Sequence, residues 1–159
     1  MNAMEALKKQ LVKHLNGGEA FMPLEEMLKE ISFQKLGERP KNLPYSFYEL
    51  FYHICFTQND ILNYCTEIQY KAPNWPKDYW PAHREPQNEK DWRNLVENYR
   101  KDREELTKVI MDPEIELTET VPSNSSHTFL REILLVIEHS AYHSGQMLIV
   151  LRHLGLHTT

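Results

Sequence analysis

The sequence predicts an all-α protein, a four-helix bundle whose helices are joined by long crossover loops. Four long segments repeat apolar residues every three or four positions, the spacing that gives a helix one buried face. Proline and glycine residues separate these segments and mark where each helix must end. No stretch of comparable length alternates apolar and polar residues as a strand does.

The N-terminal part of the chain contains two predicted helical segments. Leucines recur at helical spacing over residues 3–15, and Gly17 and Gly18 stop that pattern. Pro23 then opens a short helical stretch that runs to Ile31, because proline is tolerated in the first turn of a helix.

The second long helix is predicted from Pro44 to near Ile68. Its apolar stripe consists of Phe47, Leu50, Phe51, Ile54, Ile61 and Leu62. The connection over residues 73–87 mixes four prolines with aromatic residues, so it cannot be regular helix. We expect this Pro/Trp loop to pack over another part of the protein.

The third and fourth long helices complete the bundle. Helical spacing returns at Asn88, and Pro113 ends the third helix. Residues 115–121 alternate apolar and polar side chains, which predicts a short strand or an extended loop without a sheet. The fourth helix carries apolar residues over 129–154 and ends at Gly155. The residues before it offer several helix caps: Ser123, Asn124, Ser125, Ser126 and Thr128.

Composition and charge restrict the functional classes. A chain of 159 residues has the size of one domain, which we place at residues 1–159. The net charge of -5, with the basic residues of 97–108 mixed among acidic ones as on a solvated helix face, argues against nucleic acid. No segment resembles a signal peptide or reaches membrane-spanning length. Cys55 and Cys65 lie about 15 Å apart on one predicted helix and cannot pair, which fits a reducing cytoplasm.

The motif with the clearest chemistry is His139-Ser-Ala-Tyr-His143 in the fourth predicted helix. Residues four apart lie about 40° from each other around a helix, so both imidazoles point the same way and can bind one metal ion. The pair lies in the apolar stripe, where a shared metal ion satisfies ring nitrogens that are otherwise unpaired. Position 140 is serine, so the general-base glutamate of the His-Glu-x-x-His metalloprotease motif is missing.

His53 is the third candidate ligand, because it borders the apolar stripe of the second long helix. Three histidines leave coordination positions open, as in catalytic rather than structural metal sites. The alternative interpretation is a set of hydrogen-bonded core histidines without a metal. The remaining histidines are predicted to be solvated: His14, His83, His127, His153 and His157. Four aromatic residues are candidates to line a pocket or to belong to the core: Tyr142, Trp75, Trp80 and Trp92.

Polar residues near the histidines are candidates to orient the imidazoles. Glu132 and Gln146 lie within about 20° of His139 on the helical wheel, two turns away on either side. Glu49 and Asp60 flank His53 in a similar way. Exposed or helix-capping roles are the alternative for each of these residues.

Two segments carry a resemblance to a known family: Leu43-Pro-Tyr-Ser-Phe-Tyr-Glu-Leu-Phe-Tyr-His53 and Ile137-Glu-His139-Ser-Ala-Tyr-His143-Ser-Gly-Gln146. Together with residues 17–21 and 151–155, they resemble the DinB/YfiT-like superfamily of metal-dependent enzymes. The resemblance implies a four-helix bundle, frequently a homodimer, in which His53, His139 and His143 bind Zn, Ni, Mn or Fe. The basic residue usual after the second histidine of the pair is Ser144 here.

The resemblance also implies a function. Relatives include thiol S-transferases that use bacillithiol, mycothiol or glutathione, and a maleylpyruvate isomerase. We therefore expect a divalent metal ion that activates a low-molecular-weight thiol or water for attack on a small electrophilic substrate. A thiol S-transferase is the favoured form and a hydrolase the alternative. A non-catalytic, metal-binding stress-response dimer and a plain helical bundle with core histidines are interpretations of a different class.

Overall fold

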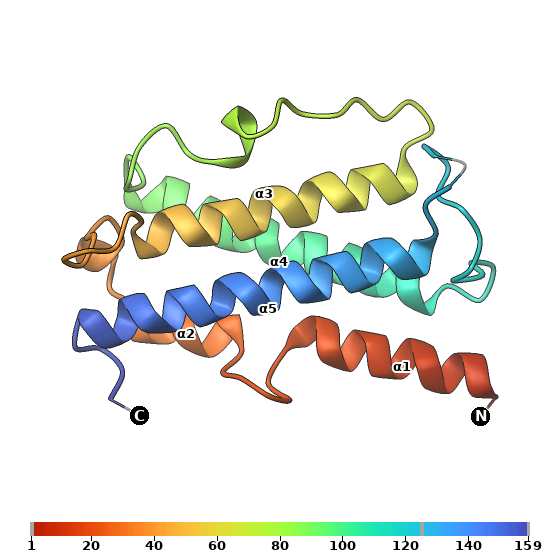
Figure 1. The fold of residues 1–159 in the computed structure, drawn as a ribbon, viewed down its shortest axis with the longest axis horizontal. Helices are drawn as coiled ribbons and strands as arrows, with labels where there is room; N and C mark the ends of the chain where they lie inside the picture. Colours follow the sequence, from red (N-terminus) through yellow and green to blue (C-terminus); the bar gives the residue numbers. More distant parts are fainter. Residues whose placement is uncertain (1, 125, 159) are drawn as a thin grey trace.

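A computed structural model describes residues 2–124 and 126–158, so the cap candidate Ser125 lies outside the described residues. Four long helices and one short helix form the bundle, with two single turns of 3-10 helix in the connections (Figure 1). The elements are α1 (Ala3–Asn16), α2 (Leu24–Glu30), η1 (Phe33–Lys35), α3 (Phe47–Thr66), η2 (Lys77–Tyr79), α4 (Glu89–Met111) and α5 (Phe129–His153). Over the described residues this is an all-α fold without a strand, as predicted.

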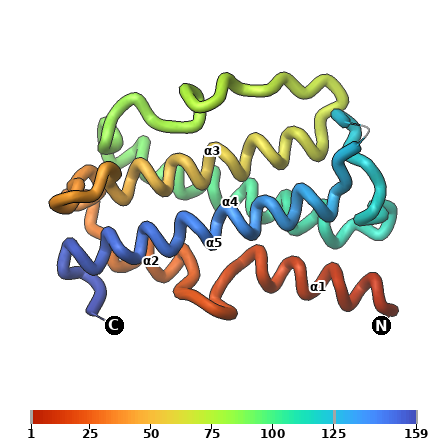
Figure 2. The backbone as a smooth tube through the Cα atoms, in the orientation of Figure 1, coloured from red at the N-terminus to blue at the C-terminus, as the bar shows by residue number. Residues whose placement is uncertain are grey.

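The long helices pack around a shared core. Helix α3 contacts both α4 and α5, and α1 contacts α4 and α5 from the other side. Helices α1 and α2 lie end to end along α5 (Figure 1). The connection after α3 runs back along the whole length of that helix before α4 begins (Figure 2). This crossover makes α3 and α4 parallel, and it places the Pro/Trp loop beside α3.

The segment 115–121 forms turns instead of the short strand that its alternation allowed. One isolated bridge joins Thr120 to Thr128. The first N–H groups of α5 donate to backbone carbonyls of this segment: Leu130 N–H donates to the Leu117 carbonyl over 2.8 Å and Phe129 N–H to the Glu119 carbonyl over 3.1 Å. The segment therefore caps the N-terminus of α5, because the first N–H groups of a helix have no partner within the helix.

Helix α3 begins at Phe47, three residues after the predicted start at Pro44, because Ser46 and Glu49 form a capping box. The Ser46 hydroxyl accepts from the Glu49 N–H, and the Glu49 carboxylate accepts from the Ser46 N–H over 2.7 Å. Arg39 pairs with the same carboxylate. Glu49 is therefore a cap and does not orient His53, because its carboxylate is already used at the helix start.

The substitution Glu49→Gln tests this cap. Burial alone raises the pKa of Glu49, but hydrogen bonds from Arg39 and from the Ser46 backbone outweigh burial and hold the pKa below its ordinary value. The ionised carboxylate therefore stabilises the fold at neutral pH, and this contribution is lost as the pH falls through the lowered pKa. We expect a loss of about 1 to 2 kcal/mol near neutral pH, measured by urea denaturation.

The same measurement under acidic conditions provides the contrast. At a pH below the lowered pKa of Glu49 the two proteins should differ much less, because the carboxylate is then protonated in both folded and unfolded chains. The exposed Glu104, replaced by glutamine, is the matched control and should stay within about 0.5 kcal/mol of the parent. An equal loss at both pH values would contradict a role for the charge.

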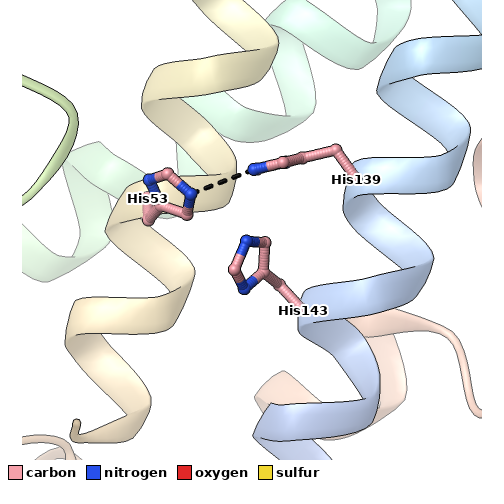
Figure 3. A group of neighbouring side chains, drawn as sticks. All are labelled: His53, His139 and His143. Atoms are coloured by element: carbon pink, nitrogen blue, oxygen red, sulfur yellow. Dashed lines mark hydrogen bonds between the residues drawn. The ribbon is translucent and has the colours of Figure 1, made fainter. Parts of the chain in front are cut away.

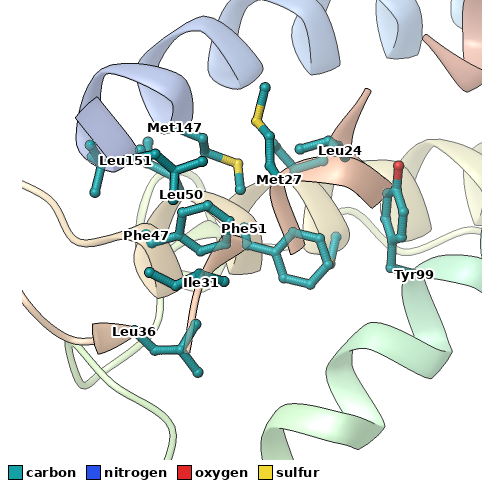
Figure 4. Close-up of a cluster of buried hydrophobic side chains, with 13 residues drawn as sticks. Leu24, Met27, Ile31, Leu36, Phe47, Leu50, Phe51, Tyr99, Met147 and Leu151 are labelled. Carbon is teal, nitrogen blue, oxygen red and sulfur yellow. The ribbon is translucent and has the colours of Figure 1, made fainter. Parts of the chain in front are cut away.

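Buried side chains form two hydrophobic clusters, one at each end of the bundle. Figure 4 shows the cluster that joins α2, the start of α3 and the end of α5. The other cluster joins α1, the end of α3, the end of α4 and the start of α5. On α5, Val136 is the last residue of the second cluster and Met147 is the first residue of the cluster in Figure 4. Both side chains are fully or almost fully buried. The histidine pair of α5 lies in the interval between them.

The charged stretch 97–108 is predicted to be a solvated helix face, but one of its charged side chains, that of Arg103, is buried. Arg103 is only 8% exposed. Its guanidinium donates to the Leu15 carbonyl at the end of α1, and it lies over the Tyr99 ring at 5.0 Å. This arginine therefore joins α4 to α1. Cys55 and Cys65 are unpaired, as expected, and the structure shows that both are buried. None of the helices in the described residues is long and apolar enough to cross a membrane.

Candidate metal centre

Three histidines from two helices meet in the middle of the bundle. His53 comes from α3, and His139 and His143 come from successive turns of α5 (Figure 3). One ring nitrogen from each lies within 4.8 Å of those of the other two. The closest pair is His53 Nε2 and His139 Nε2, 3.0 Å apart. The structure thus brings together the three residues that the sequence singled out.

Hydrogen bonds on the outer side of two rings determine which nitrogen faces the centre. The Nδ1–H of His53 donates to the backbone carbonyl of Tyr79 over 3.0 Å. The Nδ1–H of His143 donates to Oε1 of Gln146 over 2.6 Å. A carbonyl oxygen can only accept, so each of these rings carries its proton on Nδ1 and its lone pair on Nε2. Figure 3 shows one nitrogen of each ring turned toward the other two.

This arrangement of donors fits a divalent transition-metal ion. Neutral imidazoles are good ligands for such ions, and outer hydrogen bonds from the second ring nitrogen are typical of metal-binding histidines. His53 Nε2 has no proton to give, so the contact with His139 Nε2 requires the proton of His139. A cation at the centre would replace that single shared proton and accept lone pairs from all three rings. The cluster could therefore hold a metal ion.

The electrostatics of the cluster favour the neutral form of each ring. Burial lowers the pKa of His53 and of His143, although their hydrogen bonds to Tyr79 and Gln146 act in the opposite direction. Burial, together with the two neighbouring imidazoles, lowers the pKa of His139 to about 3. Charged imidazolium is thus disfavoured at neutral pH, which keeps the rings in the state that binds metals.

The Pro/Trp loop covers one side of the cluster, which confirms the expectation that it packs over the protein. The indole of Trp80 stacks on the His53 ring, with centroids 4.1 Å apart and planes 5° from parallel. The carbonyl of the preceding residue, Tyr79, holds Nδ1 of the same ring. The loop therefore restricts the His53 ring from its face and from its outer edge.

The other aromatic residues proposed to line a pocket have different surroundings. Tyr142 is 65% exposed and meets the His143 ring nearly at a right angle, with centroids 4.9 Å apart. Trp92 instead packs against Phe51 in the core. Trp75 is 70% exposed and contacts Tyr79. Trp80 and Tyr142 are thus the two of these four that contact the histidines.

Of the two polar residues predicted to orient the α5 histidines, Gln146 contacts one of them and Glu132 has other partners. Gln146 lies three positions after His143 in the chain and contacts its ring. Glu132 is buried but pairs with Arg131, and lies 3.5 Å from His127 Nδ1. The helical wheel aligned Glu132 with His139 in angle, but seven residues of helix put about 10 Å between them along the axis. That prediction for Glu132 is wrong for this reason.

Two of the histidines predicted to be solvated are partly buried and have partners. His127 Nδ1 lies 2.8 Å from the Tyr64 hydroxyl. His157 Nδ1 lies 2.9 Å from a carboxylate oxygen of Glu30. The other three are exposed as predicted: His14, His83 and His153. None of these five belongs to the cluster of His53, His139 and His143.

Sequence reasoning missed the Tyr79 carbonyl entirely. A backbone carbonyl carries no residue-type signal, so the only indication was an aromatic-rich loop of unusual length. Trp80 was considered as a pocket residue, but its stacking on His53 depends on where the crossover loop lies.

Comparison with known proteins places these observations in a family context. A family model described as the DinB superfamily matches residues 19–147, a range that contains all three clustered histidines. A crystal structure from Exiguobacterium sibiricum 255-15, described as belonging to the DinB family, has a TM-score of 0.58 and 16% sequence identity. The alignment covers 100% of this chain and 97% of that one, and at this identity it shows the fold alone. A search of curated proteins found no match.

Proposed function

The chain belongs to the DinB superfamily, and from this premise we propose that it is a metal-dependent transferase that activates a low-molecular-weight thiol. The observation that carries the proposal is the convergence of three ring nitrogens within 4.8 Å of one another. Three protein ligands leave coordination positions open for a reactant, the arrangement that catalytic sites use. The second reactant is a small electrophilic molecule.

The residues of the chain have separate roles in this proposal. His53, His139 and His143 hold the ion, which when bound lowers the pKa of a thiol and so supplies a nucleophile at neutral pH. The Tyr79 carbonyl and the Gln146 side chain keep the first and last of these rings in orientation. Trp80 and Tyr142 supply apolar surface beside the rings, where an organic substrate can pack.

A purely structural role for the ion is less well supported by the packing. The ligands come from α3 and α5, which already share the most extensive helix contact in the bundle. Buried apolar clusters lie on both sides of the histidines along α5. The helices therefore have other reasons to stay together, whereas a staple is needed where such packing is weak.

Metal analysis combined with an activity panel tests the proposal. We expect about one divalent ion per chain, identified among Zn, Ni, Mn and Fe by elemental analysis. The loaded protein should conjugate bacillithiol, mycothiol or glutathione to electrophiles such as aryl halides, and chelation should abolish conjugation without unfolding the bundle. Circular dichroism of the chelated protein provides the control for folding.

The same panel separates the alternatives. Hydrolysis of ester or amide substrates without thiol consumption would favour water as the nucleophile and a hydrolase. A chelated protein that unfolds, together with inactivity across the panel, would contradict the proposal and favour a metal that only supports the fold. The homodimer and the identity of the small-molecule substrate stay predictions.

A further inference from the structure

Asp60 is linked to the histidine cluster through Tyr79, although it contacts none of the three rings. We propose that Asp60 is a positioning residue, which by holding Tyr79 keeps His53 in the tautomer that presents Nε2 to the cluster. As a statement about metal affinity, this inference rests on the proposed function. As a statement about the His53 ring, it can be tested without any metal.

The Asp60 carboxylate binds the Pro/Trp loop and its preceding segment at two points. It lies on α3, seven residues after His53. Its Oδ2 accepts from the Tyr79 hydroxyl over 2.5 Å, and its Oδ1 accepts from the Tyr70 hydroxyl over 2.6 Å. Burial and the adjacent carboxylate both raise the pKa of each tyrosine, so both hydroxyls remain donors. One carboxylate thus ties two distant points of the crossover connection to α3.

Tyr79 transmits this anchoring to the cluster through its backbone. Its ring is held by the Asp60 carboxylate at one end and packs against Phe56 of α3, with centroids 4.9 Å apart. A ring held in this way restricts the position of the carbonyl on the same residue. That carbonyl accepts the Nδ1–H of His53. The path from Asp60 to His53 therefore consists of one residue and two hydrogen bonds.

The chemical consequence concerns where His53 carries its proton. A neutral imidazole has one N–H and one lone pair, and the hydrogen bond at one nitrogen decides which is which. With the Tyr79 carbonyl in place, Nδ1 keeps the proton and Nε2 offers a lone pair 3.0 Å from His139 Nε2. If the carbonyl moves away, the proton can reside on Nε2, and the ring then cannot act as a ligand through that atom.

Two substitutions with a matched control test the inference on the full chain. Asp60→Ala removes both hydrogen bonds, and Tyr79→Phe removes one of them while keeping the ring that packs on Phe56. Tyr70→Phe removes the other hydrogen bond to the same carboxylate, but Tyr70 lies nine residues before Tyr79, whose carbonyl holds the His53 ring. If the substitutions only loosen the loop, Tyr79→Phe and Tyr70→Phe should have similar effects on His53. If Asp60 positions His53 through Tyr79, only Tyr79→Phe should have a large effect.

The first measurement is imidazole ¹⁵N NMR of the metal-free protein. We expect His53 to be protonated at Nδ1 in the parent and to show a clear shift toward the Nε2-protonated form in Asp60→Ala and Tyr79→Phe. The second measurement is a Zn²⁺ titration, in which these two variants should bind about 10- to 100-fold more weakly. Tyr70→Phe should have a much smaller effect in both measurements.

The outcomes separate this inference from the proposed function. Protonation of His53 at Nε2 in the parent protein, or equal effects of Tyr79→Phe and Tyr70→Phe, would overturn the positioning role. If Asp60→Ala fails to fold, Tyr79→Phe alone decides, because it retains the packing of the ring. A parent protein that binds none of Zn²⁺, Ni²⁺, Mn²⁺ and Fe²⁺ would sink the proposed function, while the NMR comparison would still decide whether Asp60 sets the tautomer.

Discussion

Replacing His53, His139 or His143 singly by alanine is expected to lower the affinity for Zn²⁺ by about 10²- to 10³-fold. Zinc sites with four protein ligands bind with about 10 to 16 kcal/mol, so each ligand supplies about 2.5 to 4 kcal/mol. The two remaining histidines each offer one ring nitrogen to the cluster, so neither can supply the missing donor. Titration with Zn²⁺ in competition with a chromophoric chelator measures the difference.

The matched control is His153→Ala, which removes an exposed histidine from the last turn of α5. It should bind Zn²⁺ as tightly as the parent. The three cluster variants should still unfold cooperatively, because the buried clusters on both sides of the site remain. Unchanged affinity in any one cluster variant would show that its ring is not a ligand. Loss of affinity in His153→Ala would show that a different site dominates the titration.

Replacing Phe51 by alanine is expected to lower the free energy of unfolding by about 3 to 5 kcal/mol. The side chain is fully buried, and Figure 4 shows it within the cluster that joins α2, α3 and α5. Its ring also packs against Trp92 and Tyr99 of α4, with centroids 5.2 Å and 5.3 Å away. Alanine would leave a cavity and would remove the contacts of the Phe51 ring with α4 and with the surrounding cluster. Urea denaturation of the metal-free protein measures the loss.

The control for this core variant is Ile68→Ala, just after α3, where the side chain is 83% exposed. It should change the free energy of unfolding by no more than about 0.5 kcal/mol. A loss below about 1 kcal/mol for Phe51→Ala would contradict the tight packing at this position. Because Phe51 lies two residues before His53, the variant also tests the site. We expect weaker Zn²⁺ binding if the start of α3 shifts.

The positions of the long helices were predictable because helical periodicity and helix caps are local features of sequence. The first helix, predicted over residues 3–15, is Ala3–Asn16 in the structure. The sequence predicts the start of α3 at Pro44, because proline signals a first turn more visibly than the Ser46–Glu49 capping box does. Capping depends on which side chains bind the free N–H groups at a helix start. The observed helix boundaries therefore differ from the predicted ones by a few residues, although each predicted long helix is present.

The polar residues around the histidines were predictable only in part, because a helical wheel records angle and ignores distance along the axis. Gln146 reaches His143 from one turn away. Glu132 has a favourable angle but lies too far from His139, and its carboxylate pairs with Arg131 instead. Asp60 was singled out beside His53, yet it reaches the ring through the Tyr79 backbone, a route that no pattern in the sequence describes.

The sequence by itself determined the all-α bundle and the alignment of His139 with His143, because both follow from contacts within a single helix. It also contained the family resemblance that pointed to His53. Only the tertiary structure decided that the His53 ring meets that pair and which loop residue holds its outer nitrogen. Those contacts join residues far apart in the chain, so their distances depend on how α3 packs against α5 and on the path of the crossover loop.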